Sequence, residues 1–149
     1  MKKAMLASIV VAAMGSLSGY QAPQTQTERE LLALERASLD GWLKGDAGPM
    51  LAAADPEITL FHVMTPGRLE GIAPVRELYA AYNGRPLYDS YQIASPKVQA
   101  GADIAVLTYQ LVTRNGDGTQ RYNATEVFQR KSAGWKVIHS HFSAGGSRP

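Results

Sequence analysis

The sequence predicts an α+β fold in which helices near the N-terminus are followed by a mostly antiparallel sheet. Three observations carry this prediction. Apolar residues recur at helical spacing over residues 27–45, apolar and polar residues alternate over most of residues 88–143, and turns rich in Gly or Pro separate the alternating segments. The expected order is helix, helix, strand, helix and then four strands joined as hairpins, which segregates the helices from the sheet.

The first helix is expected to begin at Thr27 and to end at Gly45. Thr27 and Glu30 fit a capping box, in which both side chains accept hydrogen bonds from backbone groups at the helix start. Gly45 tolerates the positive φ that commonly follows the last helical turn. A second, short helix is expected over Asp46–Ala54 and a third over Ile72–Tyr82.

The strands are delimited by turn residues. Asp55-Pro56 is expected to stop the second helix, and Pro96 indicates an edge strand or a bulge. Asn115-Gly116-Asp117-Gly118 is typical of a tight hairpin, because glycine admits positive φ. The expected strands are Glu57–Val63, a short extended segment at Arg68–Gly71, Tyr88–Gln99, Ile104–Arg114, Thr119–Lys131 and Trp135–Ser143.

Composition indicates one globular domain without a basic face. The chain has 149 residues, of which 45% are hydrophobic and 19% charged. Its formal charge of +2 falls to zero without Lys2 and Lys3, because 13 basic residues then face 13 acidic ones. Nucleic acid is therefore not an expected partner. The chain has no cysteine, which excludes disulfides and thiolate chemistry.

Residues 1–22 are interpreted as an export signal. Lys2 and Lys3 precede the apolar run Ala4–Met14, which suits a signal-peptide core and is short for a membrane span. Tyr20 stands where a lipoprotein signal would need Cys, so we expect no stable membrane anchor after cleavage; an uncleaved apolar tail is the alternative. The expected organisation is signal peptide 1–22, linker 23–26, domain 27–143 and flexible tail 144–149, in a periplasmic or secreted bacterial protein.

His62 and Glu126 are the candidate catalytic residues. His62 follows Ile58 and Leu60 on one strand face, and its imidazole titrates near neutral pH, as a general base requires. Glu126 shares a strand face with Phe128, where burial would raise the pKa of its carboxyl and suit it to act as an acid. A structural hydrogen bond between His62 and Glu126, or ligand binding without chemistry, are the alternatives.

His139 and His141 alternate along the last strand, where we expect them to share a face with Trp135 and Val137. A His-x-His pair can chelate a metal, but no third ligand is apparent, so neither a metal nor a cofactor is expected. We expect both histidines on the outer, oligomer-facing surface of the sheet.

A cluster of tyrosines at positions 79, 82, 88 and 91 either shapes the mouth of a pocket for a flat or aromatic ligand or belongs to the core. The residues expected to contact a ligand are Ser38, Trp42, Phe61, Tyr79, Tyr82, Phe128 and Phe142.

Four short motifs occur in order along the chain: Gly45-Asp46, Asp55-Pro56, Leu69-Glu70-Gly71 and the segment from Gly134 to His139. In this order and spacing they resemble the nuclear transport factor 2-like superfamily, which includes SnoaL-like and ketosteroid isomerase-like proteins. The resemblance covers about Thr27–Ser143. It implies a cone, in which a curved, mostly antiparallel sheet wraps around a long N-terminal helix with two further helices and leaves a pocket.

Within the superfamily, the chain resembles most the association domain of calcium/calmodulin-dependent protein kinase II. That domain is an oligomerisation hub, which implies a homodimer or higher homo-oligomer formed through the sheet. Glu126 and Phe142 stand where arginines line the pocket of that domain, so its acid-binding pocket is not carried over. The matching residues are Thr59, Phe61, Glu70, Gly71, His139 and His141.

Ketosteroid isomerase is the second resemblance. It places a general-base Asp nine residues before the Gly that opens the third helix, and this position is His62 here. Its second, protonated Asp matches Glu126, and its oxyanion-hole Tyr falls at about Ser38. The resemblance therefore implies a pocket with ionisable groups, but the changed residue types do not imply the isomerase activity.

Three functions stay open at this point, because one fold hosts many functions. The first is an exported, homo-oligomerising domain that binds a small-molecule ligand. The second is an isomerase-, dehydratase- or hydrolase-type enzyme that uses His62 and Glu126. The third is an interaction module without a working pocket.

Overall fold

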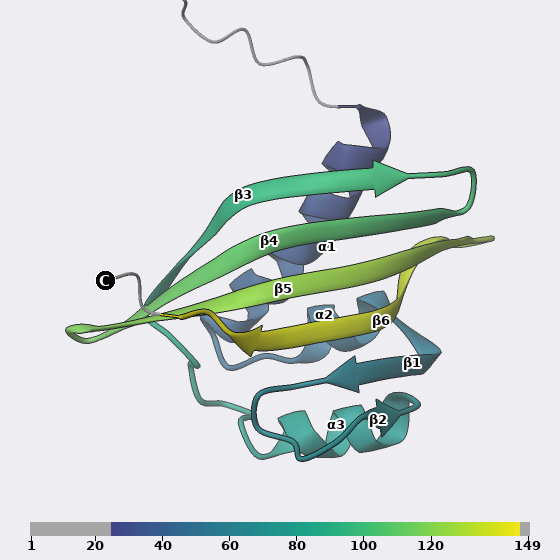
Figure 1. Ribbon diagram of the computed structural model, residues 1–149. Coiled ribbons are helices and arrows are strands. Elements are labelled where there is room, and N and C mark those ends of the chain that lie inside the picture. Colours follow the sequence, from purple (N-terminus) through teal and green to yellow (C-terminus); the bar gives the residue numbers. More distant parts are fainter. Residues whose placement is uncertain (1–24, 147–149) are drawn as a thin grey trace, which may run out of the picture.

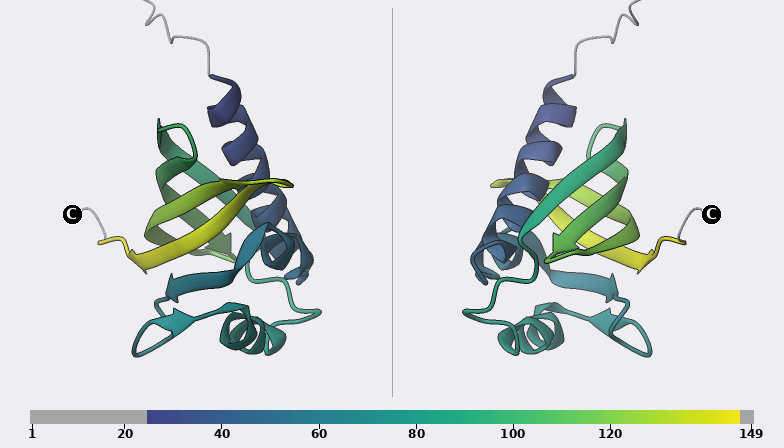
Figure 2. Two further views of the ribbon diagram at one scale, coloured as in Figure 1. Left: turned by 90° about the vertical axis from the view of Figure 1, so that its right-hand side faces the viewer. Right: turned by 90° about the vertical axis from the view of Figure 1, so that its left-hand side faces the viewer.

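The computed structural model describes residues 25–146, which form three helices and a six-stranded sheet. The helices are α1 (Gln26–Trp42), α2 (Gly48–Ala53) and α3 (Ile72–Ala80), and the strands are β1 (Ala54–Phe61), β2 (Leu69–Glu70), β3 (Ser90–Ala100), β4 (Ile104–Asn115), β5 (Gly118–Lys131) and β6 (Gly134–Ala144). The strand order is β2-β1-β6-β5-β4-β3, with only the β1–β6 pair parallel. The sheet is strongly twisted, and α1 lies across one of its faces (Figures 1 and 2). The predicted α+β fold is therefore confirmed.

The two chain ends are only partly described. The predicted signal segment, residues 1–22, lies outside the described residues, as do residues 23–24 and 147–149. Among residues 25–146, no helix combines the length and the apolar character that a bilayer crossing requires. The backbone N–H of Gly145 donates to the carbonyl of Arg121 at 2.8 Å, so the start of the predicted flexible tail is attached to β5.

The residue that caps α1 is Thr25, two residues before the predicted Thr27. Oγ1 of Thr25 accepts a hydrogen bond from the N–H of Glu28 at 3.2 Å, and the Glu28 carboxylate accepts one from the N–H of Thr25 at 2.6 Å. The sequence contains two overlapping Thr-x-x-Glu patterns, and the earlier one forms the capping box in place of Thr27 and Glu30. Glu30 instead accepts a hydrogen bond from the indole of Trp135 at 3.1 Å.

The predicted stop at Asp55-Pro56 lies inside β1. Helix α2 passes directly into this strand, which ends one residue before His62. A residue that precedes proline favours extended backbone, so Asp55 supports a strand here rather than a loop. Helix α3 is two residues shorter than predicted and ends at Ala80.

Strands β3–β6 form consecutive hairpins, as the alternating pattern predicted. Asn115 pairs with Gly118 across a two-residue turn, in which Gly116 has a φ of 56°. Pro96 lies where the register of the edge strand β3 shifts, between residues 94 and 97, which confirms the expected bulge at this edge.

The inner face of the sheet packs against α1 and forms the core. Alternate residues of each strand point inward, and the largest fully buried side chains come from the sheet, α1 and α3. They are Phe128, Leu31, Leu60, Leu107 and Val75.

A β-bulge in β6 decides which of its side chains face inward. The pairing of β5 with β6 is regular up to Val137 and resumes at His139, so Ile138 is an extra residue. The prediction placed His139 and His141 on the face of Trp135 and Val137. That prediction is wrong, because the extra residue reverses the alternation and leaves the histidines on the opposite, outer face.

Candidate functional site

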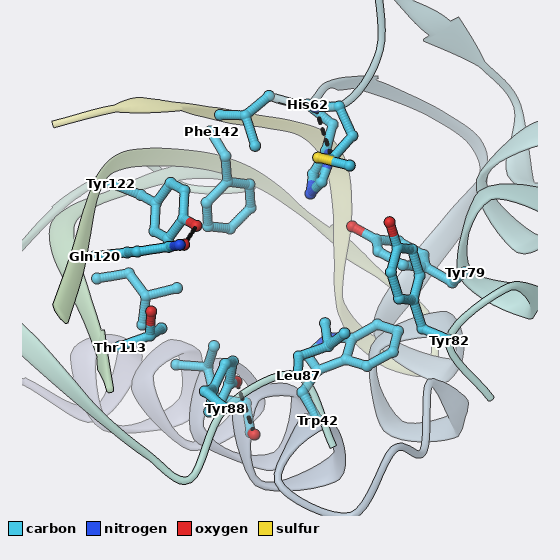
Figure 3. Close-up of a pocket in the computed structure, with 14 residues that line it drawn as sticks. Trp42, His62, Tyr79, Tyr82, Leu87, Tyr88, Thr113, Gln120, Tyr122 and Phe142 are labelled. Atoms are coloured by element: carbon cyan, nitrogen blue, oxygen red, sulfur yellow. Dashed lines mark hydrogen bonds between the residues drawn. The ribbon is translucent and has the colours of Figure 1, made fainter. Parts of the chain in front are cut away.

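A cavity of about 280 Å³, called the main cavity below, lies between the end of α1, helix α3, the loop after β1 and the inner face of β4–β6 (Figure 3). Most of its wall is aromatic or aliphatic, and no Lys, Arg, Asp or Glu belongs to the lining. The lining residues are Leu39, Trp42, His62, Val63, Met64, Tyr79, Tyr82, Leu87, Tyr88, Leu111, Thr113, Gln120, Tyr122 and Phe142.

His62 contributes the one imidazole of this wall. Its Nδ1 accepts a hydrogen bond from the backbone N–H of Met64 at 3.2 Å, so in the neutral ring the proton resides on Nε2. Burial lowers the pKa of His62 below its ordinary value of 6.5, which favours this neutral form. Figure 3 shows the imidazole opposite Trp42 and Tyr88, with its other nitrogen directed into the cavity. His62 therefore offers the cavity a hydrogen-bond donor.

Backbone and hydroxyl contacts fix the aromatic wall. The rings of Trp42 and Tyr79 lie 4.7 Å apart between centroids, and the His62 ring meets Tyr79 edge-on at 6.0 Å. The N–H of Leu87 donates to the carbonyl of Trp42 at 3.1 Å, and the hydroxyl of Tyr88 donates to the carbonyl of Leu39 at 2.9 Å. The last turn of α1 is thus attached to the segment that leads into β3.

A smaller cavity of about 50 Å³, called the inner cavity, adjoins the main cavity. The two are neighbours because Leu39, Trp42, Tyr79 and Phe142 line both. The remaining wall of the inner cavity combines apolar core residues with two carboxyls and two hydroxyls. These polar residues are Glu35, Ser38, Glu126 and Ser140.

Glu126 is held by a cross-strand pair on the inner face. It lies opposite Ser140, whose Oγ donates a hydrogen bond to Oε1 at 2.9 Å. Oε2 of Glu126 is buried and has no hydrogen-bond partner. Burial raises the pKa of Glu126 well above its ordinary value of 4.5, and the negative charge of Glu35 raises it further, while the Ser140 bond acts in the opposite direction. The surroundings of Glu126 therefore favour its protonated form.

Glu35 projects from α1 into the same region and is only 4% exposed. The hydroxyl of Tyr109 on β4 donates a hydrogen bond to it. Burial and the charge of Glu35 raise the pKa of Tyr109 far above 10, and burial with the charges of Glu126 and Glu35 does the same for Tyr79. Both phenols consequently stay protonated, and that of Tyr109 acts as a donor.

The structure brings most of the predicted site residues together, but in two cavities. His62 and Tyr82 line the main cavity, whereas Ser38 and Glu126 line the inner one. The direct hydrogen bond between His62 and Glu126, which was one of the alternatives, is not formed; His62 bonds to Met64 and Glu126 to Ser140. Trp42, Tyr79 and Phe142 contact both cavities.

Two predicted ligand contacts lie elsewhere. Phe128 is fully buried in the core and lines neither cavity. Phe61 is 40% exposed on the outer face, because it alternates with the inward-facing Ile58 and Leu60 on the same strand.

Sequence reasoning missed Glu35 and Tyr109. A signal for Glu35 was present, because this charged residue falls on the same helical stripe as Leu31, Leu32 and Leu39. A carboxyl on a buried helical face needs a partner, and the tyrosine that supplies it comes from a strand 74 residues away along the chain. Nothing in the local sequence connects the two.

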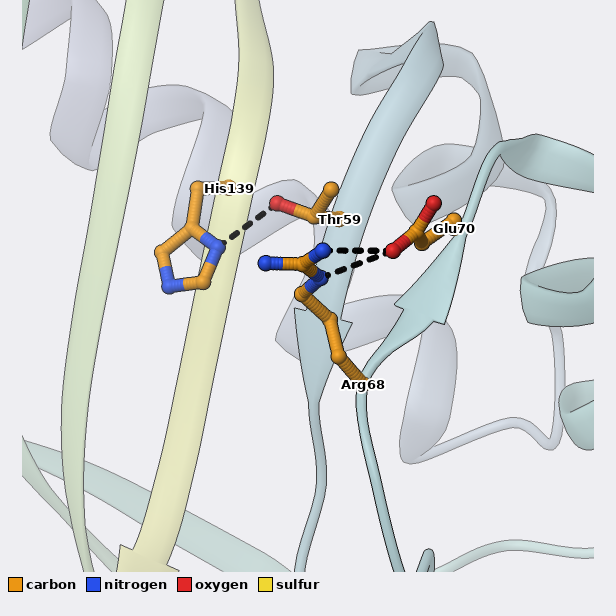
Figure 4. Close-up of polar contacts among 4 residues, drawn as sticks. All are labelled: Thr59, Arg68, Glu70 and His139. Carbon is orange, nitrogen blue, oxygen red and sulfur yellow. Dashed lines mark hydrogen bonds and ion pairs between the residues drawn. The ribbon is translucent and has the colours of Figure 1, made fainter.

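The outer face of the sheet carries a separate polar cluster (Figure 4). Thr59 and Nδ1 of His139 share a hydrogen bond of 2.8 Å, and Arg68 forms an ion pair with Glu70 at 2.5 Å. The exposed ring of Phe61 lies 6.0 Å from the His139 ring and 5.5 Å from that of His141. Among the described residues, no three His, Cys, Asp or Glu side chains gather as metal ligands would.

Comparison with known proteins identifies the family. Residues 38–146 match the SnoaL-like domain family, so the chain belongs to it. No curated protein sequence matches the chain at a significant level.

Solved structures support the same fold. A putative ketosteroid isomerase from Parabacteroides distasonis is 27% identical, with a TM-score of 0.69 over 77% of this chain and 85% of that one. The CaMKII hub of S. rosetta is 28% identical, with a TM-score of 0.66 over 78% of this chain and 95% of the hub. An NTF2-like protein of unknown function from Pseudomonas putida is 21% identical, with a TM-score of 0.72 over 81% of this chain and 88% of that protein, and this likeness concerns the fold alone. The predicted resemblance to the nuclear transport factor 2-like superfamily is confirmed.

Proposed function

We propose that the protein binds a small, planar, largely apolar molecule in the main cavity. The observation that carries this proposal is a cavity of about 280 Å³ walled by six aromatic side chains, into which the His62 imidazole is directed. Aromatic walls favour stacking with flat rings, and a few placed polar groups fix the orientation of a ligand. The cavity is open between Trp42 and Phe142, which argues against a module without a working pocket.

We infer further that the chain acts as an exported homo-oligomer. Residues 1–22 have the pattern of a signal peptide, and similar structures are described as hub or association domains. The outer face of β1 and β6 would form the contact between copies, because it exposes Phe61 beside two histidines.

An acid–base enzyme using His62 and Glu126 is the second candidate, and the likeness to a putative ketosteroid isomerase favours it. Two features of the site weigh against it. The Met64 N–H bond keeps the proton of neutral His62 on the nitrogen that faces the cavity, where a general base would need a lone pair. Glu126 lines the inner cavity and His62 the main cavity, so the two groups do not face the same cavity.

Ligand titration tests the proposed binding. The chain has two tryptophans, so the W135F variant leaves Trp42, which lines both cavities, as the only one. Naphthylethanol, a neutral bicyclic probe, should change the Trp42 fluorescence saturably and raise the melting temperature of the wild type. Ligand at 100 times its Kd would stabilise the fold by about 2.7 kcal/mol.

A matched pair of variants locates the binding site. L87W should fill the main cavity from its rim and abolish both signals, whereas I104W adds the same ring at an exposed position of β4 and should preserve them. Equal binding by L87W and I104W would place the probe outside the main cavity. The absence of any response from the wild type would contradict the proposed function.

A further inference from the structure

The inner cavity holds two buried carboxyls without a cationic partner. Glu35 is 4% and Glu126 6% exposed, and their hydrogen bonds come from the hydroxyls of Tyr109 and Ser140. No Lys, Arg or His belongs to the lining of this cavity. Burying ionised carboxyls is costly unless they are paired, so natural proteins usually place an opposite charge beside them.

One carboxylate oxygen points to a missing partner. Oε2 of Glu126 is buried and accepts no hydrogen bond from the described residues, although buried polar atoms are nearly always bonded. Glu126 lines a cavity of about 50 Å³. A water molecule needs about 10–15 Å³ on this measure, so the space suffices for an ammonium head and its first methylene. The unpaired oxygen thus lies beside room for a donor.

The partition between the cavities is also suited to a cation. Trp42, Tyr79 and Phe142 line both cavities, and the faces of aromatic rings attract positive charge. A cationic group that passes from the main to the inner cavity would move between these rings toward Glu35 and Glu126. The same ring faces and carboxyl groups would disfavour an anionic ligand.

We propose that the ligand of the main cavity is an aromatic amine, whose ammonium group occupies the inner cavity between Glu35 and Glu126. The proposal rests on the proposed binding function and adds the chemical class of the ligand. The aromatic part of the ligand stacks in the main cavity, and the ammonium donates to the free Oε2 of Glu126. A bound metal is less suited to this place, because the described residues supply no group of three metal-ligating side chains.

Proton exchange should accompany binding of the amine. Without ligand, burial and the charge of Glu35 both favour the protonated form of Glu126. The phenols of Tyr79 and Tyr109, which face the pair from α3 and β4, are neutral, as are the hydroxyls of Ser38 and Ser140. The arriving ammonium replaces the proton of Glu126, which leaves to solvent, so the charge of the site is conserved.

The test compares three naphthalene probes that differ in one terminal group. Calorimetric titration of the wild type with naphthylethylamine, naphthylethanol and naphthylpropanoate should give at least tenfold tighter binding of the amine than of the alcohol, and the weakest binding for the acid. The E126Q variant preserves size and the Ser140 contact, and should bring the amine-to-alcohol ratio close to one. E35Q should lower the same ratio, whereas E57Q, at an exposed position of β1, should leave it unchanged.

Titration in two buffers of different ionisation enthalpy measures the proton released. Close to one proton should leave when the amine binds at neutral pH and none when the alcohol binds. The amine assignment is wrong if the alcohol binds and the amine binds no more tightly than the alcohol. It is also wrong if E126Q has the same amine-to-alcohol ratio as the wild type. In both cases the proposed binding in the main cavity still stands. Tighter binding of a neutral naphthyl ketone than of the amine would likewise overturn the assignment. If no probe binds, the proposed function fails as well.

Discussion

At the scale of single residues, the two buried glutamates show how partners, and not residue type, set the chemistry of a carboxyl. Glu35 receives a phenolic hydrogen bond from Tyr109, whereas Glu126 receives one hydroxyl bond and retains an unpaired oxygen. The pKa of Glu126 rises because its charged form is desolvated and faces a second negative charge. This asymmetry is what makes the inner cavity receptive to a donor or a cation.

Replacing Glu126 by Gln should change how stability depends on pH. A carboxyl whose folded pKa lies above the unfolded value of 4.5 binds more protons in the folded state, so its contribution to stability falls as pH rises from 4.5 toward the folded pKa. E126Q removes this contribution. Its melting temperature should exceed that of the wild type by a few degrees at pH 8, and the difference should shrink toward pH 4.5.

E57Q, at an exposed position, is the control. Its melting temperature should differ little from that of the wild type over the same pH range. Thermal melts at several pH values measure both variants. A difference between E126Q and the wild type that does not vary with pH would show that Glu126 is ionised to the same degree in both states.

Removing the Tyr109 hydroxyl should be costly. Y109F leaves the buried Glu35 carboxyl without its donor, and an unsatisfied buried acceptor costs about 1–3 kcal/mol, more when it is charged. Y91F removes a phenolic hydrogen bond to the exposed Asp40 and should cost less than about 1 kcal/mol. Urea unfolding of the two variants gives the comparison. Equal losses of unfolding free energy in Y109F and Y91F would mean that the burial of Glu35 does not make its hydrogen bond more stabilising.

At this scale the sequence was informative about some residues and silent about others. Alternation correctly placed Glu126 and His62 on inward faces, since the side-chain period of a strand needs no knowledge of the rest of the fold. Alternation could not show that Glu126 and His62 line different cavities. The side chains that separate the two cavities, Trp42, Tyr79 and Phe142, come from α1, α3 and β6 and meet only in the folded chain.

At the scale of elements, the main cavity depends on how the end of α1 is attached to the chain that leads into β3. Gly45 has a φ of 68°, and its carbonyl accepts a hydrogen bond from the N–H of Gly84 at 2.8 Å. A Cβ at Gly45 would lie 2.3 Å from the backbone nitrogen of Arg85. Only glycine satisfies both the positive φ and this close approach.

Gly45 and Gly84 therefore provide a matched pair of substitutions. G84A introduces a left-handed alanine with open space around it, which should cost about 1–2 kcal/mol. G45A adds a backbone clash to the same strain and should cost about 1–3 kcal/mol more. It should also weaken probe binding, because the displaced segment carries Leu87 and Tyr88. Identical denaturation curves for G45A and G84A would mean that the close approach of Gly45 to Arg85 does not affect the free energy of unfolding.

Element boundaries show where local sequence is ambiguous. The four hairpin strands were predictable because alternation and turn residues agree over residues 88–143. The start of α1 was not predictable, since two possible capping boxes overlap, and in the structure Glu30 bonds to the distant Trp135 instead of forming one. The bulge at Ile138 was also hidden, because an extra residue in a strand leaves no local composition signal.

At the scale of the whole molecule, the two faces of the sheet differ in what they enclose and what they expose. The inner face and α1 enclose the cavities, whereas the outer face of β1 and β6 exposes Phe61 beside His139 and His141. The pKa of His139 lies below 6.5, first because of burial and then because of the charges of His141 and Arg68. A second copy of the chain on this face would desolvate His139 further and lower its pKa again.

The proposed homo-oligomer should therefore be sensitive both to charge and to pH at this face. F61K places a positive charge where two copies would meet and should convert oligomers to monomers, as measured by light scattering coupled to size exclusion. M64K introduces the same charge at a residue that is 64% exposed on the cavity rim and should preserve the oligomer. Because protonated His139 is disfavoured in the contact, wild-type oligomers should dissociate as pH falls through the region below 6.5. Retention of the oligomer by F61K, with loss in M64K, would move the interface from the sheet to the cavity rim. A wild-type monomer at all concentrations would contradict self-association altogether.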